Sequence, residues 1–306
     1  MAQLHPVTEC CATLYGHPLA AFLMGDSFHP GGLELTLELA RAAAVSEGQR
    51  VLDAGSGRGV SSVFLAETMG CRVTGLTIEA TGVEEGQAHA AAQGVSERVE
   101  FVQGDIMDMP VNLTAFDAVV MECVLSTLPD RHEALLRIRD VLKPGGTLAI
   151  TDVTREGEVP EELEGVTAAA LCLAGAISLT GYAGAIESAG FTVEETRDLP
   201  DAVGRFIDRA RNGLMLAEIA VGLGKLDVPA TTLEPAKRAV KVARDPRVKV
   251  GWAMRCWWPE RRLRSDRVAQ RSRSGGNRLL RLARFSIASF ISGTCVRIMR
   301  STISFA

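Results

Sequence analysis

From residue 49 to residue 152 the sequence alternates short apolar runs with longer stretches of helical spacing, and this alternation constrains the fold more than any other feature. The apolar runs have the length of buried strands, and the stretches between them have the length of helices. Strands that alternate with helices are joined by crossover connections, which make a mainly parallel sheet with helices on both faces. The sequence therefore predicts a doubly wound α/β fold.

Seven runs read as strands and would complete such a sheet. They cover residues 51–53, 72–76, 99–102, 116–121, 147–152, 191–195 and 248–254. Helical spacing covers residues 33–44, 60–69, 80–93 and 132–142, and most of 161–189 and 200–245. Residues 143–146 (Lys-Pro-Gly-Gly) are expected to end the helix before the fifth strand, because proline and glycine stop helices.

Three glycines recur at alternate positions directly after the first predicted strand: Gly55, Gly57 and Gly59. Glycines in this place allow a tight turn and let a ligand approach the backbone closely. The helix that follows would direct free N–H groups at an anionic or polar group. The spacing is G-x-G-x-G and not the G-x-G-x-x-G of dinucleotide binders. Alone, the turn is also consistent with a packing role.

Four further segments accompany this turn in a consistent order. Residues 75–79 (Gly-Leu-Thr-Ile-Glu) end the second strand, where ribose hydroxyls need an acceptor. Residues 104–106 (Gly-Asp-Ile) follow the third strand, where a carboxylate can accept from an adenine amino group. Asp117 opens the fourth strand, and residues 142–146 precede the fifth. With these motifs, residues 48–155 resemble the class I S-adenosylmethionine-dependent methyltransferases.

The resemblance implies a Rossmann-like fold, with S-adenosyl-L-methionine as the cofactor. It implies that Asp53 and the glycine turn hold the methionine end of the cofactor. Asp105 and Ile106 would hold the adenine, and Glu122 or Cys123 would lie under the sulfonium-side pocket. The residues expected to bind the cofactor are Asp53, Gly55, Ser56, Gly57, Gly59, Thr77, Glu79, Asp105, Ile106 and Glu122.

One departure from the family pattern concerns the ribose. Many members have Asp or Glu where Thr77 stands, and the Gly-Leu-Thr-Ile form is more similar to the group of cyclopropane fatty acid synthases and tocopherol methyltransferases. Glu79 then supplies the carboxylate, or Thr77 bonds to the ribose more weakly. A third interpretation makes Glu79 an acid in the first turn of a helix, where it interacts with the helix dipole.

The resemblance also suggests how the chain is divided. Residues 1–45 are expected to form an N-terminal helical lid. A methyltransferase domain is expected over residues 46–258, with its cofactor-binding half at 48–155 and its substrate half at 156–258. The remaining residues, 259–306, are expected to form a basic tail.

The basic tail contrasts with an acidic body. Residues 255–306 hold twelve arginines and two acids, a net charge of +10, which leaves −14 on residues 1–254. An acidic body does not favour nucleic acid as a partner. We interpret the tail as a disordered extension. The alternative is a basic amphipathic anchor for an anionic membrane or for nucleic acid.

The N-terminal residues and the spacing of the cysteines are typical of a cytoplasmic protein. Residues 1–6 show no basic segment followed by an apolar one, so no secretory signal is expected. The sequence shows no run of about 18 apolar residues, so no membrane-spanning helix is expected. Seven cysteines without a disulfide-like spacing fit a reducing cytoplasm.

Methyl transfer from a sulfonium is an in-line displacement with a neutral leaving group. The site therefore needs alignment, exclusion of water and an activated nucleophile, and no metal is expected. His29 has two interpretations. It is a general base on a lid that closes over the cofactor, or it belongs to a turn in which Pro30 and the neighbouring glycines set the geometry.

The acceptor is expected to be a small molecule, and two cysteines suggest an alternative to an organic one. Cys123 follows the fourth strand, and Cys172 lies in a Cys-x-x-Gly-Ala segment. Both resemble arsenite methyltransferases, in which thiolates bind trivalent arsenic. Otherwise both are small buried residues. A different class of function is a regulatory protein that binds the cofactor without catalysing transfer. The sequence does not indicate an oligomeric state.

Overall fold

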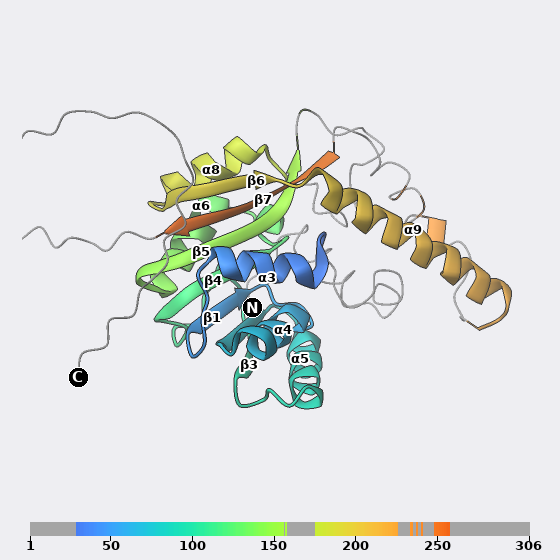
Figure 1. The fold of residues 1–306 in the computed structure, drawn as a ribbon, viewed down its shortest axis with the longest axis horizontal. Helices are drawn as coiled ribbons and strands as arrows, with labels where there is room; N and C mark the ends of the chain where they lie inside the picture. The colour runs from blue at the N-terminus through green and yellow to red at the C-terminus, as the bar shows by residue number, and fades with distance from the viewer. Residues whose placement is uncertain are drawn as a thin grey trace, which may run out of the picture. The chain divides into compact units, whose positions relative to one another are not determined.

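The computed structural model describes residues 29–155, 157, 175–225 and 248–257, together with Leu233, Glu234, Lys237 and Val240 (Figure 1). The strands are β1 (Arg50–Ala54), β2 (Arg72–Thr77), β3 (Val99–Gln103), β4 (Phe116–Glu122), β5 (Leu142–Arg155), β6 (Thr192–Asp198) and β7 (Val248–Trp257). The helices are α3 (Gly32–Ala42), α4 (Val60–Met69), α5 (Ala80–Ala92), the 3-10 turn η1 (Leu125–Thr127), α6 (Arg131–Val141), α8 (Leu179–Ser188) and α9 (Pro200–Gly222).

These strands form one sheet in the order β3-β2-β1-β4-β5-β7-β6. Neighbouring strands from β3 to β5 run parallel, and β7 runs antiparallel to both β5 and β6. The strand order reverses between β1 and β4. In open α/β sheets, ligands bind at the carboxyl ends of the strands beside such a reversal. The predicted Rossmann-like arrangement of parallel strands and helices is therefore confirmed.

Helices cover both faces of the sheet: α3, α4 and α5 pack on one face, and α6 and α8 pack on the other (Figure 1). Along β4 the side chains point alternately to the two faces of the sheet. Ala118 and Val120 belong to the apolar cluster under α3 and α4, whereas Val119 and Met121 belong to the cluster under α6 and α8. All four are at most 1% exposed. Burial on both faces explains why this strand is almost continuously apolar.

The start of β5 differs from the prediction. α6 ends at Val141 and β5 begins at Leu142, so residues 143–146 lie within the strand and not in a connection. Leu142 pairs with Phe116, and the register between β4 and β5 then shifts. The helix therefore ends before the proline and the glycines as predicted, and only the start of the strand differs, because pairing with β4 begins at Leu142.

Asp117 links three strands at the amino-terminal edge of the sheet. Its carboxylate accepts hydrogen bonds from the backbone N–H of Arg50 at 2.9 Å and from Lys143 Nζ at 2.6 Å. Burial opposes the charge of Asp117, but these two basic partners outweigh it and lower the pKa of the carboxyl. This motif residue therefore joins β4 to β1 and β5, on the edge opposite the glycine turn.

Several predicted segments fall partly outside the described residues. Residues 1–28, which hold most of the predicted lid, lie outside them, as do residues 158–174 and the predicted tail from residue 259. Of the predicted helical stretches 161–189 and 200–245, the described residues hold α8 and α9, and most of the remainder lies outside them. Across the helices that the structure describes, none combines the length and apolar character needed to cross a membrane.

Candidate functional site

The glycine turn (residues 55–59) joins β1 to α4 at the carboxyl edge of the sheet. Gly55, Gly57 and Gly59 have φ angles of 91°, 52° and 79°, in the left-handed region that favours glycine. The backbone N–H groups of Gly55 and Ser56 both donate to the carbonyl of Leu76 at 2.9 Å. These bonds hold the turn against the end of β2, beside the reversal in strand order.

The three glycines of the turn have different surroundings. A Cβ atom at Gly55 would lie 2.4 Å from Val124 Cγ2, and one at Gly59 would lie 2.4 Å from Phe101 Cζ. Nothing lies within 4 Å of the position that a Cβ at Gly57 would take. Packing therefore requires the first and third glycines, whereas the second leaves open space in which a ligand can approach the backbone.

Asp53, at the end of β1, is a buried carboxylate. It is 3% exposed and accepts a hydrogen bond from Ser62 Oγ at 2.6 Å. Burial raises the pKa of Asp53 to about 7; the bond from Ser62 opposes the rise, and the charge of Glu122 adds to it. A carboxyl group that titrates near neutral pH at the binding edge of a sheet is typical of a functional site.

The two residues predicted to meet the ribose lie at and after the end of β2. Thr77 is 5% exposed, and its hydroxyl lies 2.9 Å from the position that a Cβ at Gly82 would take. Glu79 occupies the N-cap position of α5, but its side chain makes no capping hydrogen bond. Burial raises the pKa of Glu79, and the charge of Glu85 adds to the rise. The carboxylate of Glu79 therefore does not serve to cap the helix.

The two residues predicted to hold the adenine follow β3. Asp105 Oδ1 accepts a hydrogen bond from the backbone N–H of Met107 at 2.9 Å, which orients the carboxylate. Ile106 is 6% exposed and belongs to the apolar cluster on the face of α6 and α8. Most of the Ile106 side chain is therefore part of the core.

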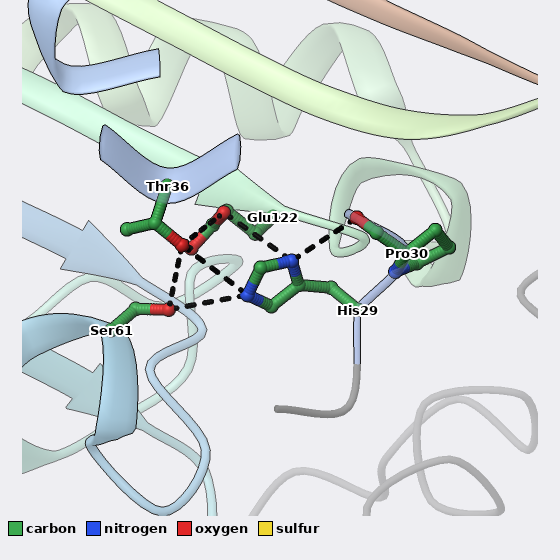
Figure 2. Close-up of polar contacts among 5 residues, drawn as sticks. All are labelled: His29, Pro30, Thr36, Ser61 and Glu122. Carbon is green, nitrogen blue, oxygen red and sulfur yellow. Dashed lines mark hydrogen bonds and ion pairs between the residues drawn. The ribbon is translucent and has the colours of Figure 1, made fainter. Parts of the chain in front are cut away.

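Four polar side chains form a polar cluster where α3, α4 and β4 meet: His29, Thr36, Ser61 and Glu122 (Figure 2). Thr36 Oγ1 donates to Glu122 Oε1 at 2.9 Å, and His29 Nδ1 lies 3.5 Å from the same oxygen. His29 Nε2 lies 3.4 Å from both Thr36 Oγ1 and Ser61 Oγ. The side chains of His29 and Glu122 are only 11% and 5% exposed. Figure 2 shows Glu122, Thr36 and Ser61 on one side of the imidazole and the carbonyl of Pro30 on the other.

Thr36 and Ser61 were not among the residues predicted from the sequence. Thr36 stands between Leu35 and Leu37 in a helix rich in leucine, and it is 0% exposed. A buried hydroxyl needs a polar partner. A threonine on an apolar helix face therefore indicates a buried polar contact, and this pattern could have identified Thr36. Ser61 carries no such signal, because polar residues are ordinary near a helix start.

Of the two cysteines predicted to bind an acceptor, only Cys123 lies in the described part of the chain. It follows β4 with a φ of 57°, which is uncommon for a residue other than glycine. Its backbone N–H donates to the carbonyl of Thr151 at 2.7 Å. Cys172 lies outside the described residues. No group of three or more His, Cys, Asp and Glu side chains that could hold a metal ion occurs among the residues described.

Comparison with protein families matches residues 45–210 to a family described as "Methyltransferase domain". The match covers more than half of the chain. The chain belongs to this methyltransferase family. The prediction of a class I S-adenosylmethionine-dependent methyltransferase, made from the glycine turn and the motifs that follow it, is thereby confirmed.

The methyltransferase resembles proteins from several organisms. An uncharacterized protein of Haemophilus influenzae is 26% identical over 247 residues, which are 79% of this chain and 96% of that protein. The erythromycin 3''-O-methyltransferase of Saccharopolyspora erythraea is 37% identical over 122 residues. This match spans 39% of the chain and only 40% of that enzyme.

A solved structure shares the fold. Phosphoethanolamine N-methyltransferase 2 of Haemonchus contortus, in complex with S-adenosyl-L-methionine, superposes with a TM-score of 0.66 at 19% identity. The superposition covers 79% of this chain and 56% of that one. None of these three relatives has a name that refers to arsenic, so they give the arsenic alternative no support.

Proposed function

We propose that this methyltransferase transfers the methyl group of S-adenosylmethionine to a small organic acceptor by in-line displacement. The observation that carries the proposal is the open space over Gly57, in a turn fixed beside the reversal in strand order. The resemblance to an enzyme named for O-methylation of erythromycin supports an organic acceptor. Membership of a methyltransferase family supports transfer over a purely regulatory role.

The residues at this edge fit the cofactor. Ser56 Oγ is a buried atom that has no hydrogen-bond partner within the described structure, and it lies in the glycine turn. A bound ligand with polar groups would supply that partner. We assign the methionine end of the cofactor to Asp53, Gly55, Ser56, Gly57 and Gly59, the ribose to Thr77 and Glu79, and the adenine to Asp105 with the edge of Ile106.

When bound, the cofactor supplies the methyl group on a sulfonium, and the protein supplies alignment and a dry environment. Asp53 is buried next to the turn, so a positive group placed there would favour its ionised form. The proposal retains a lid over residues 1–45, a methyltransferase domain over 46–258 and a separate tail over 259–306.

Calorimetry with S-adenosylhomocysteine tests this placement through Gly57→Ala. A Cβ at this position meets no protein atom within 4 Å, so the variant is expected to fold with only the strain of its positive φ, about 1–2 kcal/mol. The new methyl group occupies the space assigned to the ligand. We therefore expect the affinity to fall by about tenfold or more, a change of about 1.4 kcal/mol or more.

Gly94→Ala is the matched control. Gly94 also has a positive φ, 69°, and nothing within 4 Å of an added Cβ, but it follows α5 away from the turn. We expect this variant to lose comparable stability and to bind S-adenosylhomocysteine as the wild type does. Equal affinities for both variants and the wild type would contradict the placement, and absence of binding by the folded wild type would contradict the proposed function.

A further inference from the structure

The polar cluster lies beside the residues to which the proposed function assigns the methionine end of the cofactor. Glu122 ends β4, which pairs with β1 beside the reversal in strand order, and Ser61 stands in the first turn of α4 directly after the glycine turn. His29 lies next to both residues: its ring is within 3.5 Å of Glu122 and within 3.4 Å of Ser61 (Figure 2). The cluster therefore borders the site assigned to the cofactor.

The atoms around the imidazole determine which nitrogen carries the proton. Nδ1 of His29 faces Glu122 Oε1 at 3.5 Å and the carbonyl oxygen of Pro30 at 3.4 Å. A carboxylate oxygen and a carbonyl oxygen only accept hydrogen bonds, so Nδ1 must donate. In the neutral ring, Nε2 then carries the lone pair. The cluster thus presents a basic nitrogen on the side of α4.

Two hydroxyl groups lie near that lone pair, and they differ in whether a proton is available. Thr36 Oγ1 lies 3.4 Å from Nε2, but its single proton is donated to Glu122 at 2.9 Å. Ser61 Oγ also lies 3.4 Å away, the same distance as the Pro30 carbonyl from Nδ1, and its hydroxyl can donate to Nε2. Ser61 is only partly buried. Nε2 therefore faces the hydroxyl of Ser61, in the place where the hydroxyl of an acceptor would donate its proton.

We infer that the acceptor of this methyltransferase is a hydroxyl compound and that His29 is the base that takes its proton. The inference rests on the proposed function and adds the class of acceptor. As the hydroxyl oxygen forms a bond to the methyl carbon, the carbon–sulfur bond breaks and its electron pair stays on the sulfur. The hydroxyl proton goes to His29 Nε2, which later releases it to water. Glu122 and Thr36 are positioning residues that orient the ring.

The chemistry of nucleophiles favours the hydroxyl over other acceptors. An amine attacks as the neutral base and loses its proton afterwards, and a thiol ionises at about pH 8.5. A phenol ionises only near pH 10, and an aliphatic alcohol is weaker still as an acid. A hydroxyl acceptor therefore gains most from a base placed at the site. The buried carboxylate of Glu122 stabilises the imidazolium that forms, as in other base–carboxylate pairs.

The experiment follows formation of S-adenosylhomocysteine by the full chain with four probes of related skeleton: benzyl alcohol, phenol, benzylamine and benzyl mercaptan. We expect transfer to at least one hydroxyl probe. In His29→Ala, kcat for that probe is expected to fall by about 100-fold to 10,000-fold. Added imidazole is expected to restore part of the rate, which a merely structural role for His29 would not allow. His132→Ala, at an exposed histidine of α6, is the control and should keep the rate.

Thr36 is tested as a positioning residue by a pair of variants. Thr36→Ser keeps the hydroxyl that donates to Glu122 and is expected to keep kcat. Thr36→Val removes it and is expected to lower kcat by about tenfold, the effect of one hydrogen bond to a charged group, with little change in KM. Equal kcat values for the two variants would exclude this role.

A readout without any acceptor is the nitrogen NMR spectrum of histidine-labelled protein. With His29 assigned by its absence from His29→Ala, we expect the neutral ring to be protonated at Nδ1. Protonation at Nε2, full activity of His29→Ala, or transfer to the amine or thiol but to neither hydroxyl probe would each overturn the inference. So would absence of transfer to all four probes. S-adenosylhomocysteine binding by the same preparations shows whether the proposed function survives that outcome.

Discussion

The Asp53→Asn variant is expected to exceed the wild type in free energy of unfolding by about 2–4 kcal/mol near pH 8. Burial raises the pKa of the Asp53 carboxyl from 3.8 to about 7, so its charge is penalised in the folded protein. One pKa unit corresponds to about 1.4 kcal/mol, and the ionised carboxylate therefore costs the fold on the order of 4 kcal/mol. Asparagine keeps an acceptor for Ser62 and carries no charge.

The pH dependence of this difference has a definite sign. Below about pH 4 the carboxyl is protonated in the folded and the unfolded chain, and both proteins are expected to be similarly stable. Between about pH 4 and pH 7 the unfolded chain has lost its proton while the folded one retains it, so the stability contribution of Asp53 falls as pH rises. Urea denaturation across this range measures the divergence of the two curves.

Asp117→Asn is the matched control for Asp53→Asn. Its partners Lys143 and Arg50 lower the pKa of Asp117, so its contribution to stability is present at neutral pH and is lost as pH falls. That variant is expected to be less stable than the wild type near neutral pH, the opposite of Asp53→Asn. No gain in Asp53→Asn at the alkaline end would show that the buried carboxylate is not penalised.

Asp53→Asn is also expected to weaken S-adenosylhomocysteine binding. Loss of a charged hydrogen-bond acceptor costs about 1.5–3 kcal/mol, which corresponds to tenfold or more in the dissociation constant. Calorimetry at a single pH measures the dissociation constant of S-adenosylhomocysteine for the variant and the wild type. Greater stability with weaker binding is the pattern expected of a strained functional site. Unchanged affinity would remove Asp53 from the cofactor site while leaving the stability argument intact.

The features that the sequence predicts correctly have local causes. The apolar run after residue 49 and the glycines that follow it predict β1, the turn and α4, because short-range backbone geometry decides all three. The predicted helix over residues 60–69 agrees with α4 at both ends. A positive φ favours glycine, and in this turn the alternate glycines mark three such positions.

The features that the sequence does not predict depend on distant residues. Glu122 lies 86 positions from Thr36, and only the pairing of β4 beside β1 brings it to α3. The sequence alone therefore leaves His29 with two interpretations, and it indicates neither Thr36 nor Ser61 as its partner. The burial of Ile106 in the apolar cluster likewise depends on residues far apart in the sequence, whereas its predicted contact with adenine rests on the motif after β3.

Replacing Phe101 with alanine is expected to lower the free energy of unfolding by about 3–5 kcal/mol. The ring is 7% exposed and is enclosed by glycines of the turn, of β2 and of α5. A Cβ at Gly59, Gly75 or Gly86 would lie 2.4, 2.5 or 2.7 Å from a ring atom. None of these residues has a side chain that can fill the cavity left by the ring. Thermal denaturation measures the loss, and binding of S-adenosylhomocysteine should weaken because the ring supports Gly59.

Gly86→Ala tests the same contact from the helix side. Alanine normally stabilises a helix interior by about 1 kcal/mol relative to glycine, so a loss of stability here reports the clash with Phe101. Gly184→Ala is the control, because Gly184 is exposed in α8 with nothing within 4 Å of an added Cβ, and it is expected to gain stability. Combined with Phe101→Leu, Gly86→Ala should cost less than the sum of the single changes, by about 0.5 kcal/mol or more. If the losses of stability in the two single variants add up to that of the double variant, Gly86 and the Phe101 ring do not interact.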